Sequence, residues 1–258
     1  MGIIKLEASL ASNGNKVFRL QTRIFHILHR RFLVKDIPII INNYNRLEYL
    51  QQQVEWLMQS GHFNIHIIDN ASTYPPLINF YKKTKLRVYV LDRNVGHEAF
   101  WRTHLFQRFG RYYHVLTDPD VLPDDNTPND FLAYFYELLQ QYPLMKKVGF
   151  GMRTDDLPDY YPKKQEVINW ENKMYADEIE PAVYKSKIDT TFALYRPGAF
   201  LQCWDDTFRT GAPYLLRHMP WYENPTAMNE ESIYYLDHAG ISSSWYKSLR
   251  GEDKRYDS

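Results

Sequence analysis

The spacing of apolar residues changes at regular intervals along the first half of the chain. Short runs rich in apolar, strand-forming residues occupy 37–41, 64–69, 86–92 and 112–117. Runs of this length, bounded by turn-forming residues, are typical of buried strands. Segments of helical spacing separate them, at 47–57, 75–84 and 97–108. This alternation predicts an α/β fold with a doubly wound, mostly parallel sheet flanked by helices.

The pattern loosens beyond Asn126. We expect helices at 129–142 and 229–238, and strands at 146–152 and 187–195, with a long Pro- and Tyr-rich region between them. No repeat or low-complexity linker separates this α+β part from the sheet. We therefore predict one domain over 37–258, made of a sheet lobe (37–125) and a second lobe (126–258), after an N-terminal basic segment (1–36).

Polar residues follow all four strands of the first half. They are Asn42 and Asn43, Asp69 and Asn70, Asp92 to Asn94, and Asp118 with Asp120. In an open parallel sheet the strand carboxyl ends share one edge, and ligands bind in the crevice outside it. Asn and Asp are also common turn formers, so any one of these positions has a purely local explanation. Four loops together favour a binding site.

Composition narrows the class of protein. The chain has 258 residues, 44% of them hydrophobic, and a formal net charge of zero. We therefore expect an ordinary globular core and no nucleic-acid partner. The single cysteine, Cys203, cannot form an internal disulfide. No signal peptide and no apolar run of membrane-spanning length is visible, so we expect a cytoplasmic protein.

Residues 16–35 contain six Lys or Arg and no acidic residue, interleaved with apolar side chains. Such a basic amphipathic segment can lie peripherally on an anionic membrane surface. A helix that packs its apolar side on the domain is the alternative, and the pattern fits both.

The Asp118-Pro119-Asp120 sequence carries two carboxylates at a strand end. A turn at Pro119 would let both face one divalent cation, Mn²⁺ or Mg²⁺, with positions left for diphosphate oxygens. A solvated acidic turn is the alternative interpretation.

Four segments, IPIIINNYNR, IHIIDNAST, VLDRNVGH and HVLTDPDV, occur in the order and spacing seen in a known family. Over residues 37–125 the chain resembles nucleotide-sugar-dependent glycosyltransferases of the GT-A fold, most like the inverting family 2 type. Asn42-Asn43 departs from the Pro-Thr or Pro-Ser that is common there.

The resemblance implies roles for particular residues. Asn43 and Asp69 would contact the base or ribose of the donor, Arg93 and Asn94 would lie near the nucleotide, and Asp118 and Asp120 would form the DxD motif. The implied reaction moves a sugar, as a hexosyltransferase does, from a UDP-, GDP- or dTDP-sugar. The acceptor would be a hydroxyl of a glycan or lipid-linked molecule, as in polysaccharide biosynthesis.

The second lobe should supply the acceptor site. His218 is a candidate further metal ligand, although a lone His is more often structural. Asn229 predicts an N-cap, which places Glu230 and Glu231 in a first helical turn where the ionised form is favoured. We predict that one of them is the catalytic base, with Asp189 and Asp156 as the next candidates.

Three other functions share an acidic strand end. A sugar-phosphate nucleotidyltransferase needs a Gly-rich loop after its first strand, and NNYNRLEYL has no glycine. A phosphatase with an Asp nucleophile would need Thr where Leu122 stands. A catalytically silent nucleotide- or sugar-binding protein would keep the crevice without the chemistry.

Overall fold

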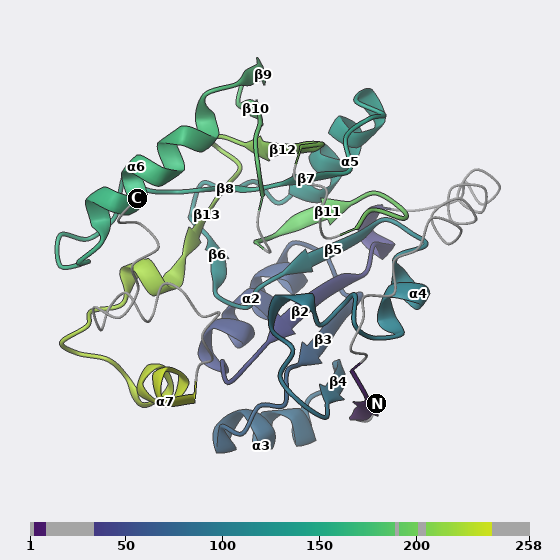
Figure 1. Cartoon of the computed structure of the whole chain (residues 1–258), viewed down its shortest axis with the longest axis vertical. Coiled ribbons are helices and arrows are strands. Elements are labelled where there is room, and N and C mark those ends of the chain that lie inside the picture. Colours follow the sequence, from purple (N-terminus) through teal and green to yellow (C-terminus); the bar gives the residue numbers. More distant parts are fainter. Residues whose placement is uncertain (1–2, 9–33, 189–190, 201–204, 239–258) are drawn as a thin grey trace.

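The computed structural model describes residues 3–8, 34–188, 191–200 and 205–238, which form a mixed α/β fold (Figure 1). Its main element is a ten-stranded sheet, accompanied by a separate three-stranded sheet. The strands of the large sheet are, in spatial order, β1 (Ile4–Leu6), β4 (Arg87–Leu91), β3 (Ile65–Asp69), β2 (Ile39–Asn43), β5 (His114–Thr117), β11 (Ala193–Tyr195), β7 (Lys147–Gly149), β12 (Thr207–Thr210), β10 (Val183–Lys185) and β9 (Glu178–Glu180).

The first five strands of this order are parallel. The register places Ile41 of β2 opposite both Ile67 of β3 and Thr117 of β5, so the carboxyl ends of these strands reach the same edge. The chain passes outward from β2 through β3 to β4 and then returns to add β5 on the other side of β2. The boundary between β2 and β5 is therefore a topological switch point, where ligands bind in open α/β sheets.

The rest of the large sheet is mixed. Strand β11 is antiparallel to both of its neighbours, β5 and β7, whereas β7 and β12 are parallel. Strands β10 and β9 continue from β12 in antiparallel order. The small sheet consists of β6 (Val121–Pro123), β13 (Leu215–His218) and β8 (Gly151–Met152), with β13 antiparallel to β6 and parallel to β8.

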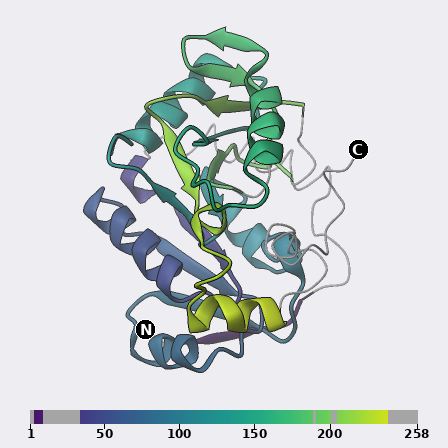
Figure 2. The same ribbon diagram turned by 90° about the vertical axis from the view of Figure 1, so that its left-hand side faces the viewer.

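Helices cover both faces of the large sheet. The α-helices are α2 (Glu48–Gln59), α3 (Pro75–Lys83), α4 (Leu105–Phe109), α5 (Phe131–Gln141), α6 (Lys164–Asn172) and α7 (Glu230–His238). The 3-10 helices are η1 (Val34–Asp36), η2 (Gly96–Glu98), η3 (Lys173–Tyr175) and η4 (Met219–Tyr222). Figure 2 shows α2 and α4 on opposite sides of the sheet.

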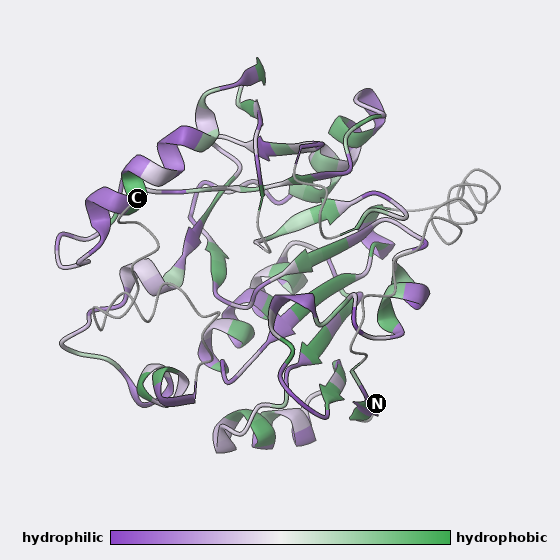
Figure 3. Ribbon diagram, in the orientation of Figure 1, coloured by the Kyte–Doolittle hydropathy of each residue, from purple (hydrophilic) through white to green (hydrophobic). Residues whose placement is uncertain are grey.

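The alternation of side chains along β2 divides the core in two. Ile39 and Ile41 belong to the cluster that contains Leu50 of α2, whereas Ile40 belongs to the cluster that contains Phe106 of α4. Because neighbouring residues of a strand point to opposite faces, a continuous apolar run is required where both faces are covered. Figure 3 shows this apolar character along the central strands.

The predicted α/β fold class is confirmed: the structure has a large, partly parallel sheet flanked by helices. The predicted helix at 97–108 is wrong, because η2 and the short α4 replace it. Phe100 and Trp101 lie between them with both side chains buried, so core packing of these aromatic rings overrides the helical spacing.

Residues 16–33 of the basic segment lie outside the described residues. No helix in the described ranges is long and apolar enough to span a membrane.

Candidate active site at the carboxyl edge of the sheet

The Asp118–Asp120 turn connects the large sheet to the small one. Strand β5 ends at Thr117, Pro119 and Asp120 form a turn, and β6 begins at Val121. Both aspartates are partly exposed. Since β2 and β5 pair through Ile41 and Thr117, the turn stands at the switch point between these strands. Asp118 and Asp120 therefore lie where open α/β sheets bind their ligands.

His218, far away in the sequence, lies beside this turn. Pairing of β13 with β6 places His218 opposite Val121, and His218 Nε2 is 4.0 Å from Asp120 Oδ1. The next residue fixes the same turn, because the Met219 backbone N–H donates to the Asp120 carbonyl at 2.8 Å. The structure thus brings together two of the three predicted metal ligands.

The donor set fits a weakly chelated cation. In the part of the chain that the structure describes, no three His, Cys, Asp or Glu side chains form a group that could hold a metal. Asp120 and His218 are separated by a distance that one cation can bridge, because metal–ligand bonds are about 2.0–2.2 Å long. Carboxylate oxygens suit Mn²⁺ and Mg²⁺, which keep other positions for water and phosphate.

Amide side chains tie the neighbouring loops together. Asn42 Nδ2 donates to the Gly96 carbonyl at 3.2 Å, and Asn70 Nδ2 donates to Asn42 Oδ1 at 2.5 Å. Asn70 Oδ1 accepts from the Val95 N–H at 3.2 Å. These bonds join the segments after β2, β3 and β4, so the edge of the sheet is one connected structure.

Asn43 and Asp69 are buried at this edge of the sheet and bind other protein groups. Neither is exposed, and both bind the hydroxyl of Tyr81, at 2.8 Å and 3.0 Å. Burial raises the pKa of Asp69, although hydrogen bonds from Ser72 and Tyr81 act in the opposite direction. In this structure the two side chains hold the loops, and neither reaches the surface where the resemblance would have them contact a base or ribose.

Arg93 and Asn94 occupy different surroundings. The Arg93 guanidinium donates to the Ala8 carbonyl at 2.6 Å and lies 3.3 Å from the Asp92 carboxylate. It therefore ties the segment after β4 to the end of β1. Asn94 Oδ1 accepts from the Gly96 N–H at 2.8 Å, and its side chain borders an open pocket.

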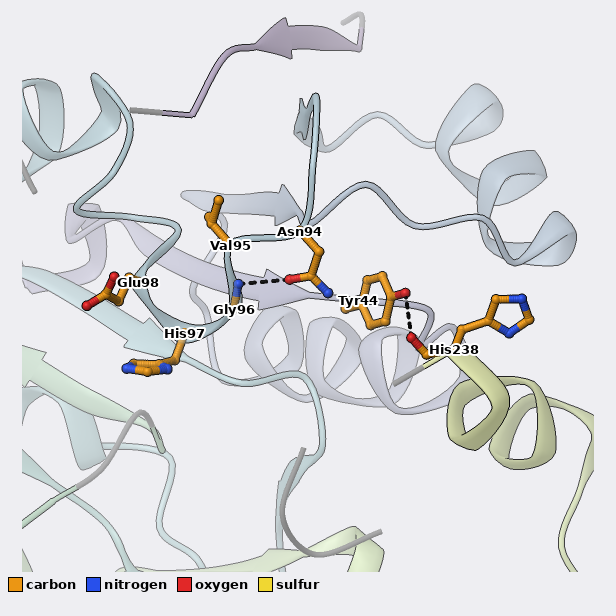
Figure 4. A pocket seen from close by; sticks show the side chains of 7 residues that line it. All are labelled: Tyr44, Asn94, Val95, Gly96, His97, Glu98 and His238. Atoms are coloured by element: carbon orange, nitrogen blue, oxygen red, sulfur yellow. Dashed lines mark hydrogen bonds between the residues drawn. The ribbon is translucent and has the colours of Figure 1, made fainter. Parts of the chain in front are cut away.

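This pocket, of about 510 Å³, lies at the carboxyl edge of the parallel strands (Figure 4). It is lined by Tyr44, Asn94, Val95, Gly96, His97, Glu98 and His238. The Tyr44 hydroxyl donates to the His238 carbonyl at 2.9 Å, which joins the segment after β2 to the end of α7. The volume is within the usual range for a small-molecule site, and the lining combines an aromatic ring with amide and imidazole groups.

Sequence reasoning missed a buried polar cluster next to this edge. The Arg46 side chain is only 1% exposed and lies 3.8 Å from Glu223 Oε1 and 4.0 Å from the centre of the Tyr235 ring. The Tyr49 hydroxyl donates to Glu223 Oε1 at 2.7 Å. Burial, followed by the nearby Glu223 carboxylate, raises the pKa of Tyr49. The sequence held one indication of this cluster. Arg46 directly follows NNYN and precedes the predicted helix, and a charged side chain beside an apolar helix face needs an oppositely charged partner.

The candidate catalytic bases differ in what their carboxylates contact. The predicted N-cap is confirmed, since the Ser232 N–H donates to Asn229 Oδ1 at 2.8 Å. Glu231 is buried, and its Oε2 accepts from the N–H groups of Leu47 and Glu48 at 2.8 Å and 3.0 Å. Glu230 is exposed, and its side chain forms no hydrogen bond or ion pair within the described ranges.

Asp156 is engaged in ion pairs. Arg217 donates to it at 2.5 Å and 2.8 Å, and the Tyr222 hydroxyl donates at 2.6 Å. Burial alone would raise the pKa of Asp156, but the bonds from Tyr222 and Arg217 hold it below its ordinary value. A carboxylate so stabilised in its ionised form is a weak proton acceptor. Asp189 lies outside the described residues.

Comparison with known proteins gives distant structural likenesses. No protein-family model matches the chain, and no curated protein does. One similar solved structure is described as a mycobacterial protein; it has 13% identity and a TM-score of 0.44, over 73% of this chain and 72% of that one. Another is glucosyl-3-phosphoglycerate synthase from Mycobacterium tuberculosis in complex with phosphoglyceric acid, with 13% identity and a TM-score of 0.36, over 74% of this chain and 64% of that one. Neither likeness is strong enough to carry a functional argument.

Proposed function

We propose that the protein is a metal-dependent glycosyltransferase that moves a sugar from a nucleotide-diphosphate sugar to a hydroxyl group. The observation that supports this most directly is the approach of His218 to Asp120 at the switch point of the sheet, 4.0 Å apart. Two potential ligands from distant parts of the chain meet at the edge where this fold class binds nucleotides. The GT-A resemblance of the sequence is a separate line of support.

Asp120 and His218 would hold the cation, Mn²⁺ or Mg²⁺, directly. Asp118, the other carboxylate of the turn, would act on the donor beside them. When bound, such a cation neutralises the negative charge that develops on a leaving diphosphate. The chain's own contribution is to keep the carboxylates and the imidazole at fixed positions, through β5, the turn and β13.

The open pocket at the carboxyl edge of the parallel strands would take the nucleoside of the donor. Tyr44 offers an aromatic ring for stacking, and Asn94 offers amide groups for hydrogen bonds to a base or ribose. UDP-, GDP- and dTDP-sugars all present a flat base and a diphosphate. The acceptor would be a glycan or a lipid-linked molecule, which approaches from the second lobe.

Transfer to a hydroxyl requires a base, because the acceptor oxygen loses its proton as it attacks. Among the described candidates we propose Glu230, since it is exposed in the first turn of α7 while Glu231 and Asp156 are occupied by other groups. Inversion of the anomeric carbon is proposed from the resemblance.

The engagement of Glu231 and Asp156 also favours a second candidate, a protein that binds nucleotide sugars without reacting them. Slow hydrolysis of a nucleotide sugar distinguishes the two functions, because a pure binding protein releases its ligand intact.

The test starts with the native protein and Mn²⁺. UDP, GDP, CMP and dTDP are each screened for a rise in melting temperature, because a ligand that binds only the folded state stabilises it. Turnover of the corresponding nucleotide sugar is then measured for the wild type, Asp120→Asn and Asp125→Asn.

Asp125 is an exposed aspartate of the following loop and serves as the matched control. We expect Asp120→Asn to lose turnover with its fold intact and Asp125→Asn to keep it. Full activity of Asp120→Asn, or of the wild type in EDTA, would exclude the metal-dependent mechanism.

A further inference from the structure

Gln53 is a polar residue on the apolar face of α2. Its neighbours on this face, Leu50, Val54 and Leu57, are all buried in the core, and the Gln53 side chain is 0% exposed. A buried amide in such surroundings is costly unless its polar atoms are hydrogen-bonded. The contacts of Gln53 therefore indicate why an amide stands at this position.

Both amide protons of Gln53 are used on the turn that carries the acidic pair. Its Nε2 donates to the Asp118 carbonyl at 2.9 Å and to the Val121 carbonyl at 2.8 Å. A primary amide has two N–H donors, and these two bonds are the shortest that Nε2 forms; its third contact, to Thr117 Oγ1, is longer at 3.4 Å. The orientation follows from the partners, because the opposite amide flip would place Oε1 against two carbonyl oxygens.

The two carbonyls enclose the turn from either side. Asp118 and Val121 stand immediately before and after Pro119 and Asp120, so one side chain fixes both ends of the segment. A third bond holds its middle, since the Met219 N–H donates to the Asp120 carbonyl. Gln53 Oε1, by contrast, is buried and has no hydrogen-bond partner in the described structure. Gln53 thus provides hydrogen bonds to the carbonyl groups of the turn, while its own acceptor oxygen stays without a partner in the described structure.

We propose that Gln53 is a positioning residue for the cation site: it sets the backbone of the Asp118–Asp120 turn, and through it the placement of the two carboxylates relative to His218. The inference rests on the proposed function, because it assumes that these residues hold a cation. It adds a residue from the core side of α2 that touches neither the metal nor a substrate.

The experiment measures binding of Mn²⁺ alone to the full chain, by electron paramagnetic resonance of the free ion during a titration. Gln53→Met keeps the length and apolar packing of the side chain but removes both donors. Gln53→Leu is a second apolar variant in case the first does not fold. Val54→Ala is the matched control, because Val54 is the next residue of the same helix and is also buried, without a bond to the turn.

We expect Gln53→Met or Gln53→Leu to weaken Mn²⁺ binding by about 10–100-fold, as is usual when a group that orients metal ligands is removed. Val54→Ala should lower the urea midpoint of unfolding and leave the dissociation constant for Mn²⁺ unchanged. If the Gln53 variants bind Mn²⁺ as tightly as the wild type, or if Val54→Ala weakens it equally, Gln53 has only a structural role. If the wild type itself does not bind Mn²⁺, the proposed cation site is wrong and the positioning role is overturned with it.

Discussion

Glu231 joins α7 to the start of α2, and substitutions of Glu231 test how much this contact stabilises the fold. Its carboxylate accepts from the Leu47 and Glu48 N–H groups at the start of α2, where Leu47 has no side-chain cap of its own. Glu231 therefore serves as the N-cap of a helix that precedes it by most of the sequence. Glu231→Ala would leave two partly buried N–H donors without this partner.

The expected loss follows from those two bonds. Removing a helix cap costs about 0.5–2 kcal/mol, and a buried donor left unsatisfied costs about 1–3 kcal/mol. Because both N–H groups are only partly buried and water can reach them in the variant, the loss of the cap accounts for most of the cost, and we expect Glu231→Ala to lower the free energy of unfolding by about 1–2 kcal/mol at pH 7. Glu231→Gln keeps an acceptor oxygen and removes a charge that burial disfavours, so we expect a change within about 1 kcal/mol.

The pH dependence has a definite sign. Burial raises the pKa of Glu231 above its ordinary value of 4.5, against the hydrogen bonds from Glu48 and Leu47. As pH rises above 4.5, the unfolded chain loses this proton before the folded chain does, so the contribution of Glu231 to stability falls through that window. Glu231→Gln lacks this group, and the stability advantage of the wild type over it should shrink as pH rises from 4 to 7.

The assay is urea unfolding followed by tryptophan fluorescence at both pH values, with transfer measured in parallel. Glu230→Gln is the control for stability alone, because Glu230 is exposed in the same helical turn. As the proposed base, Glu230 should lose transfer when replaced by Gln while the free energy of unfolding stays unchanged. A loss below about 0.5 kcal/mol in Glu231→Ala would refute the capping argument. A fall in transfer of about 10²–10⁴-fold in Glu231→Gln, with stability kept, would instead make Glu231 the base.

Three further predictions concern other parts of the fold. Glu171→Gln should cost about 3–5 kcal/mol in urea unfolding, because it breaks a buried ion pair with Arg209, and an unchanged midpoint would contradict this. Burial lowers the pKa of His114 to about 4, below its ordinary 6.5, so the unfolded chain alone binds a proton between these values and stability should fall as pH falls from 6.5 to 4. His114→Phe should flatten this fall by about 3 kcal/mol, and an equally steep profile would disprove it. Deletion of residues 1–35 should abolish flotation with anionic vesicles; binding that persists would exclude a membrane role for residues 16–35.

The parallel half of the fold was predictable because its strands are buried on both faces. Residues 39–41 are three consecutive isoleucines, and such a run is typical of a parallel strand that is buried on both faces. Most strands of the second half span two to four residues, such as Gly151–Met152 and Lys147–Gly149. Strands this short show no period of their own, and only their pairing partners fix them.

The site was predictable in part for a similar reason. Asp118 and Asp120 follow a strong strand, so their place at the carboxyl edge could be inferred. The proximity of His218 depends on the pairing of β13 with β6, which no local pattern encodes. Gln53 was missed, and the capping role of Glu231 was not foreseen although Glu231 was predicted as a base, because the partners of both side chains are backbone groups of distant segments. Sequence patterns do not reveal such partners.

The antiparallel strand between β5 and β7 has a consequence for synthesis of the protein. Strand β5 pairs with β2 on one side, but its other edge is covered only by β11, which follows about 75 residues later in the chain. At about 5–20 residues per second, a ribosome takes several seconds to deliver those residues. During that time the nascent chain presents an apolar strand edge, the kind of template on which chains aggregate. A fragment that stops before Ala193 would keep that edge permanently, so the sheet lobe should be expressed together with β11 to stay soluble.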